Sequence, residues 1–575
     1  MQAARWLDTL SASLTRNDPA GTAELFAPDS YWRDLVAFTW NIKTAEGRDG
    51  IRAMLEATLA GMRPTNFRIK GEPKENNGVA EAWFTFETAV GRGVGHLRLK
   101  NGKCWTLLTA LRELKGCEEK QGFDRSSDPE LGVIRQPYVL IVGGGQGGIG
   151  LAARLKRLGV PAIVVEKNAR AGDSWRNRYA SLCLHDPVWY DHMPYLPFPE
   201  GWPVFSPKDM MGDWLEMYTK VMGLAYWSAT RCVAARHDEG AGVWVVTVER
   251  AGKTMELRPT HLVLATGMSG VPNIPAIPGA ETFNGTLQHS SEFPGGEGWS
   301  GKRCVVVGSS TSAHDICADL WEHGAQVTMV QRSSAVVAKS ETLMELAWGT
   351  LYSDHAVKAG ITTDIADLTV ASVPFRLLPG LHRPVYEEIG RRDAKLYEGL
   401  TRAGFLHDFG EDGSGLHSLY LRRGAGYYIE VGASKMIIEG KIGLRSPAGV
   451  ARIGERSVTL SDGNGNETEL AADLVVFATG YGSMNGWAAQ LISREVADRV
   501  GKCWGLGSDT RFDPGPWVGE LRNMWKPTQQ PALWFHGGNL MQSRHYSLYL
   551  ALQLKARMAG IPTPVYGMDP VYHLS

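Results

Sequence analysis

One stretch near residue 140 constrains the fold more than any other part of the sequence. Residues 138–142 form a short apolar run, typical of a buried parallel strand. Gly143, Gly145 and Gly148 follow it directly in the spacing G-x-G-x-x-G, and an alanine- and leucine-rich helical stretch comes next. A second apolar run, residues 162–165, ends in Glu166. This order of strand, glycine turn, helix and strand is typical of a βαβ unit that binds a dinucleotide.

Each position in this unit has a physical reason. Gly143 permits the tight turn, Gly145 lets the backbone approach a pyrophosphate, and Gly148 lets helix and strand pack closely. The free N–H groups at the helix N-terminus suit phosphate. Glu166 stands 23 residues after Gly143, where an acid accepts hydrogen bonds from an adenosine ribose. We therefore predict a dinucleotide site, rather than a plain glycine-rich turn, at Gly143, Gly145, Gln146, Gly147, Gly148, Glu166 and Lys167.

The pattern occurs a second time in an altered form. Residues 304–307 predict a strand, Gly308 begins a turn, a helical stretch reaches about residue 323, and residues 327–330 predict the next strand. Ser310 replaces the middle glycine and crowds a pyrophosphate, whereas Ala313 is an accepted third residue. Arg332 stands 24 residues after Gly308, in the place that corresponds to Glu166. The predicted contacts of this second site are Gly308, Ser309, Ser312, Ala313, Arg332 and Ser333.

Two such units in one chain indicate two bound nucleotides. The acid of the first unit suits FAD or NAD, whereas the guanidinium of the second suits the 2′-phosphate of NADP. A chain that binds both moves hydride from one nucleotide to the other.

Length and composition limit the number of domains and the kinds of binding partner that this chain can have. At 575 residues the chain exceeds one hydrophobic core, so three or four domains are expected. The net charge of −1, with both signs evenly spread, gives no basis for binding nucleic acid or a membrane surface. Seven scattered cysteines without a C-x-x-C pair predict free thiols in a reducing cytoplasm. The sequence shows no apolar run of membrane-spanning length, no signal peptide, and no histidine spacing that indicates a metal site.

Residues 1–116 have a different character. Two helical patterns precede alternating strands, and Asn101-Gly102 predicts a hairpin with a type I′ turn. Helices followed by strands indicate a small α+β domain, and this element order resembles the cone-shaped NTF2-like (SnoaL-like) fold. Trp32, Asp34 and Trp40 line a pocket in one interpretation and pack a core or a subunit contact in the other, which we favour. We expect this domain to be separable from the rest of the chain. If its residues form a subunit contact, the domain is the interface of a homo-oligomer.

A motif between the two units identifies a family. It reads Phe283-x-Gly285-xxx-His289-xxx-Phe293 and resembles the F-x-G-xxx-H-xxx-[FYW] signature of class B flavoprotein monooxygenases. Two Ala-Thr-Gly turns, at residues 265–267 and 478–480, and the G-xx-W pattern at residues 172–175 belong to the same resemblance. The chain is most similar to single-polypeptide flavin-containing monooxygenases, including the auxin-forming plant type. Ser310 and the dipeptide Phe293-Pro294 depart from that pattern, and the latter resembles the Baeyer–Villiger version of the signature.

The resemblance implies a reaction. NADPH reduces FAD, and the reduced flavin reacts with oxygen to give a C4a-(hydro)peroxide that a dry pocket protects. The hydroperoxide oxygenates amines and sulfides, whereas the peroxide attacks ketones or 2-keto acids. The implied partners are a small organic substrate and molecular oxygen. The alternatives are a Baeyer–Villiger or oxidatively decarboxylating enzyme, and a non-catalytic flavin redox sensor. A disulfide reductase would need a second redox cysteine near Cys183.

The resemblance also implies further site residues. His289 and Arg544 are expected near the reacting flavin or at a hinge, with a hydrogen-bonded structural role as the alternative. The remaining expected cofactor contacts are Ser174, Trp175, His185, Val233, Thr266, Gly267, Thr479, Gly480 and Gly538.

The predicted architecture is α/β, with two dinucleotide-binding (Rossmann-like) domains, for FAD and NADPH, preceded by the NTF2-like cone domain. We place the NTF2-like domain at residues 1–116 and a linker at 117–136. The FAD-binding domain takes residues 137–295 and 466–575, and the NADPH-binding domain with a helical insertion takes residues 296–465.

Overall fold

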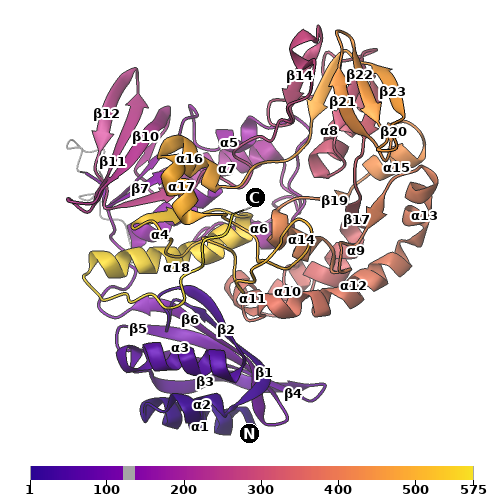
Figure 1. Ribbon diagram of the computed structural model, residues 1–575. Coiled ribbons are helices and arrows are strands. Elements are labelled where there is room, and N and C mark those ends of the chain that lie inside the picture. The colour runs from indigo at the N-terminus through magenta and orange to yellow at the C-terminus, as the bar shows by residue number, and fades with distance from the viewer. Residues whose placement is uncertain (1, 121–135, 574–575) are drawn as a thin grey trace.

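The computed structural model describes residues 2–120 and 136–573, and its N-terminal part is a mixed six-stranded sheet packed on helices (Figure 1). The strand order is β2-β1-β6-β5-β4-β3, with β1 and β6 parallel and the other neighbours antiparallel. Asn101 and Gly102 both have positive φ, which confirms the predicted hairpin turn. The elements are α1 (Gln2–Thr15), α2 (Pro19–Ala23), β1 (Phe26–Leu35), β2 (Ile42–Glu46), α3 (Gly47–Met62), β3 (Thr65–Asn76), β4 (Val79–Glu87), β5 (Gly91–Lys100) and β6 (Lys103–Leu114).

The three residues that could line a pocket in this domain lie in its core. Trp32, Asp34 and Trp40 are at most 1% exposed. The Asp34 carboxylate accepts two backbone N–H groups and the hydroxyls of Thr39 and Thr109. Burial raises the pKa of Asp34 to about 6, although these hydrogen bonds favour its charged form. The carboxylate therefore closes a buried turn, and the core interpretation holds.

The first nucleotide unit has the predicted elements in the predicted order. β7 (Val139–Val142), α4 (Gln146–Arg157) and β8 (Ala162–Val165) lie in a parallel five-stranded sheet of order β25-β13-β7-β8-β9. An antiparallel three-stranded sheet, β10-β11-β12, leads into β13. The other elements are α5 (Asp173–Arg176), α6 (Val188–Asp191), α7 (Lys208–Val221), β9 (Tyr226–Trp227), β10 (Thr230–Asp238), β11 (Val243–Arg250), β12 (Lys253–Leu257), β13 (His261–Leu264), α16 (Asn485–Leu491), α17 (Arg494–Val500) and β25 (Leu533–Phe535).

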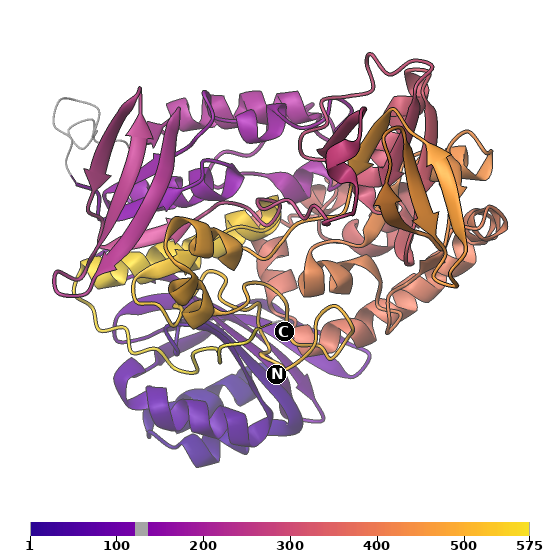
Figure 2. The ribbon, with the colours of Figure 1, turned by 45° about the horizontal axis from the view of Figure 1, so that its top comes forward.

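The second unit repeats this plan. β15 (Arg303–Val307), α8 (Thr311–Glu322) and β16 (Gln326–Val330) form its βαβ core, in a parallel sheet of order β14-β24-β15-β16-β20. Here too an antiparallel sheet, β21-β22-β23, precedes the strand that leads to an Ala-Thr-Gly turn. In Figure 2 the two antiparallel sheets mark the outer ends of the two units. The other elements are β14 (Thr286–His289), β20 (Gly443–Arg445), β21 (Gly449–Ile453), β22 (Ser457–Ser461), β23 (Glu467–Ala471) and β24 (Leu474–Phe477).

A largely helical insertion separates β16 from β20. Three helices, α10, α11 and α12, follow one another in its middle part, although prolines occur in that part of the sequence. Pro379 lies in the first turn of α12, which tolerates proline, and Pro384 lies inside the helix, where burial of Tyr386 and Ile389 outweighs its cost. The elements are β17 (Ala335–Lys339), α9 (Ser340–Leu343), α10 (Asp354–Lys358), α11 (Thr363–Ala371), α12 (Leu378–Arg392), α13 (Ala394–Arg402), β18 (His407–Asp408), α14 (Gly415–Arg423), β19 (Tyr427–Glu430) and α15 (Ala433–Ile438).

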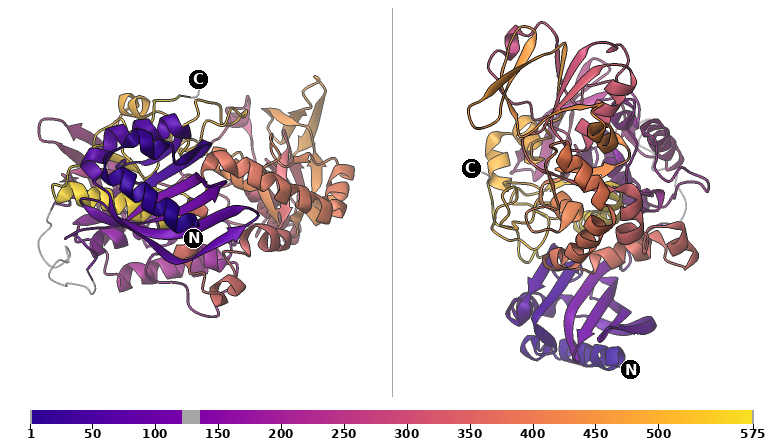
Figure 3. Two further views of the ribbon diagram at one scale, coloured as in Figure 1. Left: turned by 90° about the horizontal axis from the view of Figure 1, so that it is seen from below. Right: turned by 90° about the vertical axis from the view of Figure 1, so that its right-hand side faces the viewer.

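The last helix, α18 (Leu540–Met558), joins the parts of the molecule. Sixteen of its 19 residues are buried, since it packs on α4 on one side and on β6 of the N-terminal domain on the other. Figures 1 and 3 show the N-terminal domain directly against this helix and the insertion. One hydrophobic cluster includes Ala3, Ile141 and Ala556, so the N-terminal domain shares a core with the first nucleotide unit. This packing opposes the separability that we expected.

Two further observations concern the described residues. Most of the predicted linker, residues 117–136, lies outside them. Within residues 2–120 and 136–573, no helix is long and apolar enough to cross a membrane.

Candidate active site

A single cavity of about 1930 Å³ connects the two nucleotide units. Ligand pockets usually measure about 300–1,000 Å³, so this space exceeds what one small ligand needs. The glycine turns after β7 and β15 both line it, as do the residues that end β8 and follow β16. The helical insertion and one residue of the N-terminal domain complete the wall. The folded chain therefore brings both predicted nucleotide sites into one space.

The first glycine turn is shaped for a ligand. Gly143 has φ +107°, and a Cβ there would lie 2.4 Å from the Ala265 carbonyl oxygen. A Cβ on Gly148 would lie 2.0 Å from the Gly143 carbonyl oxygen, so helix and strand tolerate no side chain at this point. At Gly145 the nearest atom to an added Cβ is the Ser174 hydroxyl, 3.6 Å away. A side chain at Gly143 or Gly148 would therefore clash with the backbone, whereas Gly145 borders the open cavity. This arrangement fits a pyrophosphate at Gly145.

The acid at the end of β8 faces the same space. Glu166 lines the cavity although it is only 7% exposed. Its carboxylate accepts the Gly144 N–H at 2.7 Å and the Asn168 N–H at 2.9 Å. Each carboxylate oxygen has two acceptor sites, so both can still accept from a ribose hydroxyl. The backbone bonds fix the carboxylate beside the glycine turn.

The second glycine turn has the same backbone. Gly308 has φ +137°, and its Cβ would lie 2.4 Å from the Ala478 carbonyl oxygen, as Gly143 meets Ala265. Ser310 is the N-cap of α8 with φ −100° and ψ −171°, whereas Gly145 is the N-cap of α4 with φ −76° and ψ −172°. Any L-residue adopts this extended conformation, so Ser310 introduces no backbone strain. It changes only the space in front of the helix.

Of the three residues that follow β16, one packs in the interior and two line the cavity. Gln331 is fully buried, and its amide binds both backbone polar groups of Leu406, so it is committed to the insertion. Arg332 and Ser333 line the cavity instead. Arg332 is exposed and forms no ion pair with any described residue, so its guanidinium is free for an anionic ligand.

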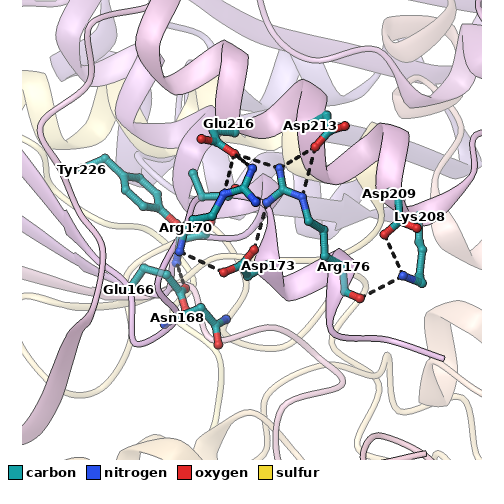
Figure 4. A network of polar contacts seen from close by, with 12 residues as sticks. Glu166, Asn168, Arg170, Asp173, Arg176, Lys208, Asp209, Asp213, Glu216 and Tyr226 are labelled. Atoms are coloured by element: carbon teal, nitrogen blue, oxygen red, sulfur yellow. Dashed lines mark hydrogen bonds and ion pairs between the residues drawn. The ribbon is translucent and has the colours of Figure 1, made fainter. Parts of the chain in front are cut away.

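A network of ion pairs holds the short helix α5 (Figure 4). Arg176 donates to Asp173 at 2.9 Å and to Glu216 of α7 at 3.0 Å, and Arg170 donates to Glu216 at 2.6 Å. The helix so fixed carries Trp175, whose indole N–H donates to the side chain of the first residue of α4 at 3.3 Å. The network therefore positions an aromatic wall beside the glycine turn.

His289 ends β14 behind the cavity wall. Its Nε2 donates to the Gly480 carbonyl oxygen at 3.0 Å, while Nδ1 accepts the Ser291 N–H at 3.1 Å. Burial lowers the pKa of His289, so the ring is neutral near pH 7 and the proton stays on Nε2. This geometry links the signature motif to the second Ala-Thr-Gly turn.

Arg544 of α18 is fully engaged in the interior. Its guanidinium makes two hydrogen bonds to Asp367 of α11, at 2.9 and 2.7 Å, and donates to the carbonyl oxygens of Tyr190 and His192. The side chain is about 6% exposed. Arg544 therefore ties the insertion to the first nucleotide unit.

The insertion and the segment around α6 supply cavity residues that no sequence motif revealed. Asp191 is 1% exposed, and neither of its carboxylate oxygens has a hydrogen-bond partner among the described residues. Burial, with Asp186 nearby, raises the pKa of Asp191 well above its usual range. Aromatic residues in this part of the wall include Tyr190, Trp348, Tyr352, Phe375 and Tyr420, and Tyr546 of α18 also lines the cavity.

Most of the predicted site residues meet in this cavity. Four lie behind its wall: Gly148, Ala313, His289 and Arg544. The others line it, and they are Gly143, Gly145, Gln146, Gly147, Glu166, Lys167, Ser174, Trp175, His185, Val233, Thr266, Gly267, Gly308, Ser309, Ser312, Arg332, Ser333, Thr479, Gly480 and Gly538.

Family models match two parts of the chain. A model described as pyridine nucleotide-disulphide oxidoreductase matches residues 137–367, and a SnoaL-like domain model matches residues 3–107. The second match confirms the predicted N-terminal fold. All seven cysteines are free thiols, so no disulfide accompanies the nucleotide motifs.

Similar proteins decide the family. The chain is 29% identical over 374 residues to indole-3-pyruvate monooxygenase YUCCA1 of Oryza sativa subsp. japonica, covering 63% of this chain and 82% of that one. It is 32% identical over 355 residues to probable indole-3-pyruvate monooxygenase YUCCA7 of Arabidopsis thaliana, covering 60% and 74%. The chain belongs to the flavin monooxygenase family. It is thus an enzyme with flavin-dependent monooxygenase activity, as the signature motif predicted.

Solved structures of flavin monooxygenases share the fold. A cyclohexanone monooxygenase crystal structure matches with a TM-score of 0.51 and 16% identity, over 74% of this chain and 88% of that one. The complex of OTEMO with FAD and NADP matches with a TM-score of 0.52 and 17% identity, over 74% and 86%. At this identity the likeness concerns the fold alone.

Proposed function

We propose that this flavin monooxygenase holds FAD at the first nucleotide unit, takes electrons from NADPH at the second, and uses oxygen to oxygenate a small organic molecule. The observation that carries the proposal is the shared cavity, which contains Glu166 of one unit and Arg332 of the other. The acid favours a free ribose, and the guanidinium favours a 2′-phosphate.

The first unit fits FAD. The open space at Gly145 and the N–H groups that begin α4 suit its pyrophosphate. Glu166 would accept hydrogen bonds from the adenosine ribose, with Lys167 next to it in sequence, and Val233 of β10 would contact the adenine. Trp175, held by the α5 network, would line the space for the flavin ring. The other proposed contacts are Gln146, Gly147, Ser174, His185, Thr266, Gly267 and Gly538, all on the cavity wall.

The second unit fits NADPH. The N-terminus of α8 faces the cavity through Ser309 and Ser312, as the pyrophosphate requires. Arg332 and Ser333 donate to the 2′-phosphate, since neither is committed to packing as Gln331 is. Gly308, Ala313, Thr479 and Gly480 shape the surrounding turns.

Bound flavin supplies the transfer of two electrons from NADPH to oxygen. The chain's own residues place the reactants and exclude water. His289 keeps its proton at Nε2 and fixes the Gly480 turn, so it acts as a positioning residue. Arg544 fixes α11 against Tyr190 and so closes the aromatic end of the cavity. We assign the substrate to this end, where the wall excludes water from the reacting centre.

The substrate is proposed to be an amine, a sulfide or a keto compound. The signature motif does not distinguish oxygenation of an amine or sulfide from insertion of oxygen beside a carbonyl or decarboxylation of a 2-keto acid. The names of the two plant relatives point to a keto acid. The test panel should therefore contain all of these classes.

The experiment is a cofactor and turnover assay on the full chain. We expect a yellow protein that releases FAD, oxidises NADPH faster than NADH, and adds one oxygen atom to a member of the panel, seen by product mass. Flavin binding without NADPH oxidation would favour a redox sensor. A colourless protein that takes up no FAD would refute the cofactor assignment.

A further inference from the structure

The N-terminal domain reaches the cavity through one side chain. Arg33 of β1 is 1% exposed and lines the cavity together with residues of the insertion and of α18. A domain that served only for attachment would have no reason to bury a cation in this wall, because burying a charge is costly unless it is well paired.

Arg33 joins three parts of the molecule. Its Nε and Nη2 donate to the two oxygens of Glu520 at 2.8 and 2.7 Å, and Nη2 also donates to the Tyr546 hydroxyl at 3.0 Å. Its Nη1 donates to the Ala371 carbonyl oxygen at 2.8 Å. The guanidinium lies 4.4 Å from the centre of the Phe375 ring. Tyr546, Ala371 and Phe375 all line the cavity.

The charge of Arg33 is already balanced. Glu520 is 1% exposed and also accepts the hydroxyl of Thr44, on β2 of the N-terminal domain, at 2.7 Å. The pair is bidentate, a geometry that holds both side chains in one orientation. Arg33 is therefore a positioning residue, and the groups that it holds make the surface that a substrate meets.

A second arginine completes the clamp on α11. The last carbonyl groups of a helix have no partner within it, and cations near a helix C-terminus are favourable. Arg33 takes the carbonyl of Ala371 and Arg98 takes that of Ser372, at 2.8 and 3.0 Å. Arg98 also donates to the Ser372 hydroxyl at 2.8 Å. The N-terminal domain thus caps the helix whose Asp367 holds Arg544.

We propose that the N-terminal domain is the closing wall of the substrate end of the cavity, with Arg33 as the residue that keeps this wall shut to water. The proposal rests on the proposed function. A loosened wall admits water and lets electrons reach oxygen unproductively: NADPH, a proton and O₂ then give NADP⁺ and hydrogen peroxide, with two electrons passing from NADPH to O₂. Cofactor binding, which involves other parts of the cavity, should be unaffected.

The test uses two variants of the full-length enzyme. Arg33→Lys keeps a charge beside Glu520 but cannot reach Tyr546 and Ala371 in the same geometry. The double variant Arg33→Gln with Glu520→Gln removes both charges, so that no lone carboxylate stays buried. Arg92→Gln is the control, because it breaks exposed ion pairs within the same domain, away from the cavity.

The measurement is hydrogen peroxide formed from NADPH without added substrate. We expect the rate of peroxide formation to rise at least about tenfold in both variants. A tenfold change corresponds to the loss of one charge-assisted contact. The flavin content of both variants and their KM for NADPH should equal those of the wild type. The Arg92→Gln control should form peroxide at the wild-type rate. An unchanged peroxide rate in Arg33→Lys, or loss of flavin from both variants, would overturn the inference. A wild type that does not oxidise NADPH would instead refute the proposed function, and this inference with it.

Discussion

The two nucleotide units are built alike and differ in what they present to the cavity. Each has a parallel five-stranded sheet, a neighbouring three-stranded antiparallel sheet, and a glycine turn pressed against an Ala-Thr-Gly turn. The N-caps of α4 and α8 have almost the same ψ. The two units nevertheless differ at two corresponding positions. Where the first unit has Gly145 the second has Ser310, and where the first has Glu166 the second has Arg332. In the proposed function, the shared backbone would bind a pyrophosphate in both units, and one side chain at a strand end would select the nucleotide.

The largest expected effect comes from placing an acid at the two N-caps. Gly145→Asp puts a carboxylate against the proposed FAD pyrophosphate, and we expect complete loss of bound flavin. Ser310→Asp should keep the flavin and weaken NADPH by more than about 100-fold, because like charges meet without water. Flavin absorbance and steady-state kinetics report the two outcomes. If Gly145→Asp retains its flavin spectrum, the units are assigned to the wrong nucleotides.

The second effect concerns the strand-end residues. Arg332→Ala removes a charge-assisted contact of about 1.5–3 kcal/mol, so apparent NADPH affinity should fall about 10- to 150-fold. NADH lacks the 2′-phosphate and should be nearly unaffected. Kinetics with both coenzymes on wild type and variant decide the matter. Equal losses for the two coenzymes, or a wild type that prefers NADH, would break the contrast with Glu166.

A third pair of variants tests whether the turns are equivalent. Gly143→Ala and Gly308→Ala both place a Cβ 2.4 Å from a carbonyl oxygen at positive φ. Each should cost about 1–3 kcal/mol of stability, seen as a lower midpoint of denaturant unfolding. Added FAD should restore stability less well to Gly143→Ala than to Gly308→Ala. A restoration that is the same for both would mean that the flavin does not distinguish the turns.

The smallest effect belongs to Ser310→Gly, which makes the second turn like the first. Because the Ser310 backbone is extended, the change costs only a few tenths of a kcal/mol in capping. The added space should tighten NADPH by up to about threefold, with flavin content unchanged. A weaker NADPH interaction would show that the hydroxyl contributes a hydrogen bond instead of crowding.

The two nucleotide units could be predicted because their information is local. Strand, turn and helix follow one another within about 30 residues, and Glu166 and Arg332 can be found by counting from a glycine. The hairpin at Asn101-Gly102 is local in the same way. The NTF2-like fold followed from element order rather than from a motif, and the family match agrees with it.

The rest depends on contacts between distant residues. Gln331 is the neighbour of Arg332 in sequence, but its amide donates to the carbonyl group of Leu406, 75 residues away. A helical insertion was predicted, but α12 within it could not be, because Pro384 normally interrupts a helix and only tertiary packing overrides that. Nothing in the local sequence around Arg33 or Asp191 indicates that these side chains reach the cavity.

The Arg33–Glu520 pair can form only late in synthesis. The two residues are 487 positions apart, and Tyr546 comes later still. At about 5–20 residues per second, the ribosome needs roughly 25–100 s to deliver the carboxylate after the arginine. During that time the N-terminal domain must carry an unmatched guanidinium on the face that will later be buried. A charged side chain favours hydration of that face until Glu520 has been made and the pair can form.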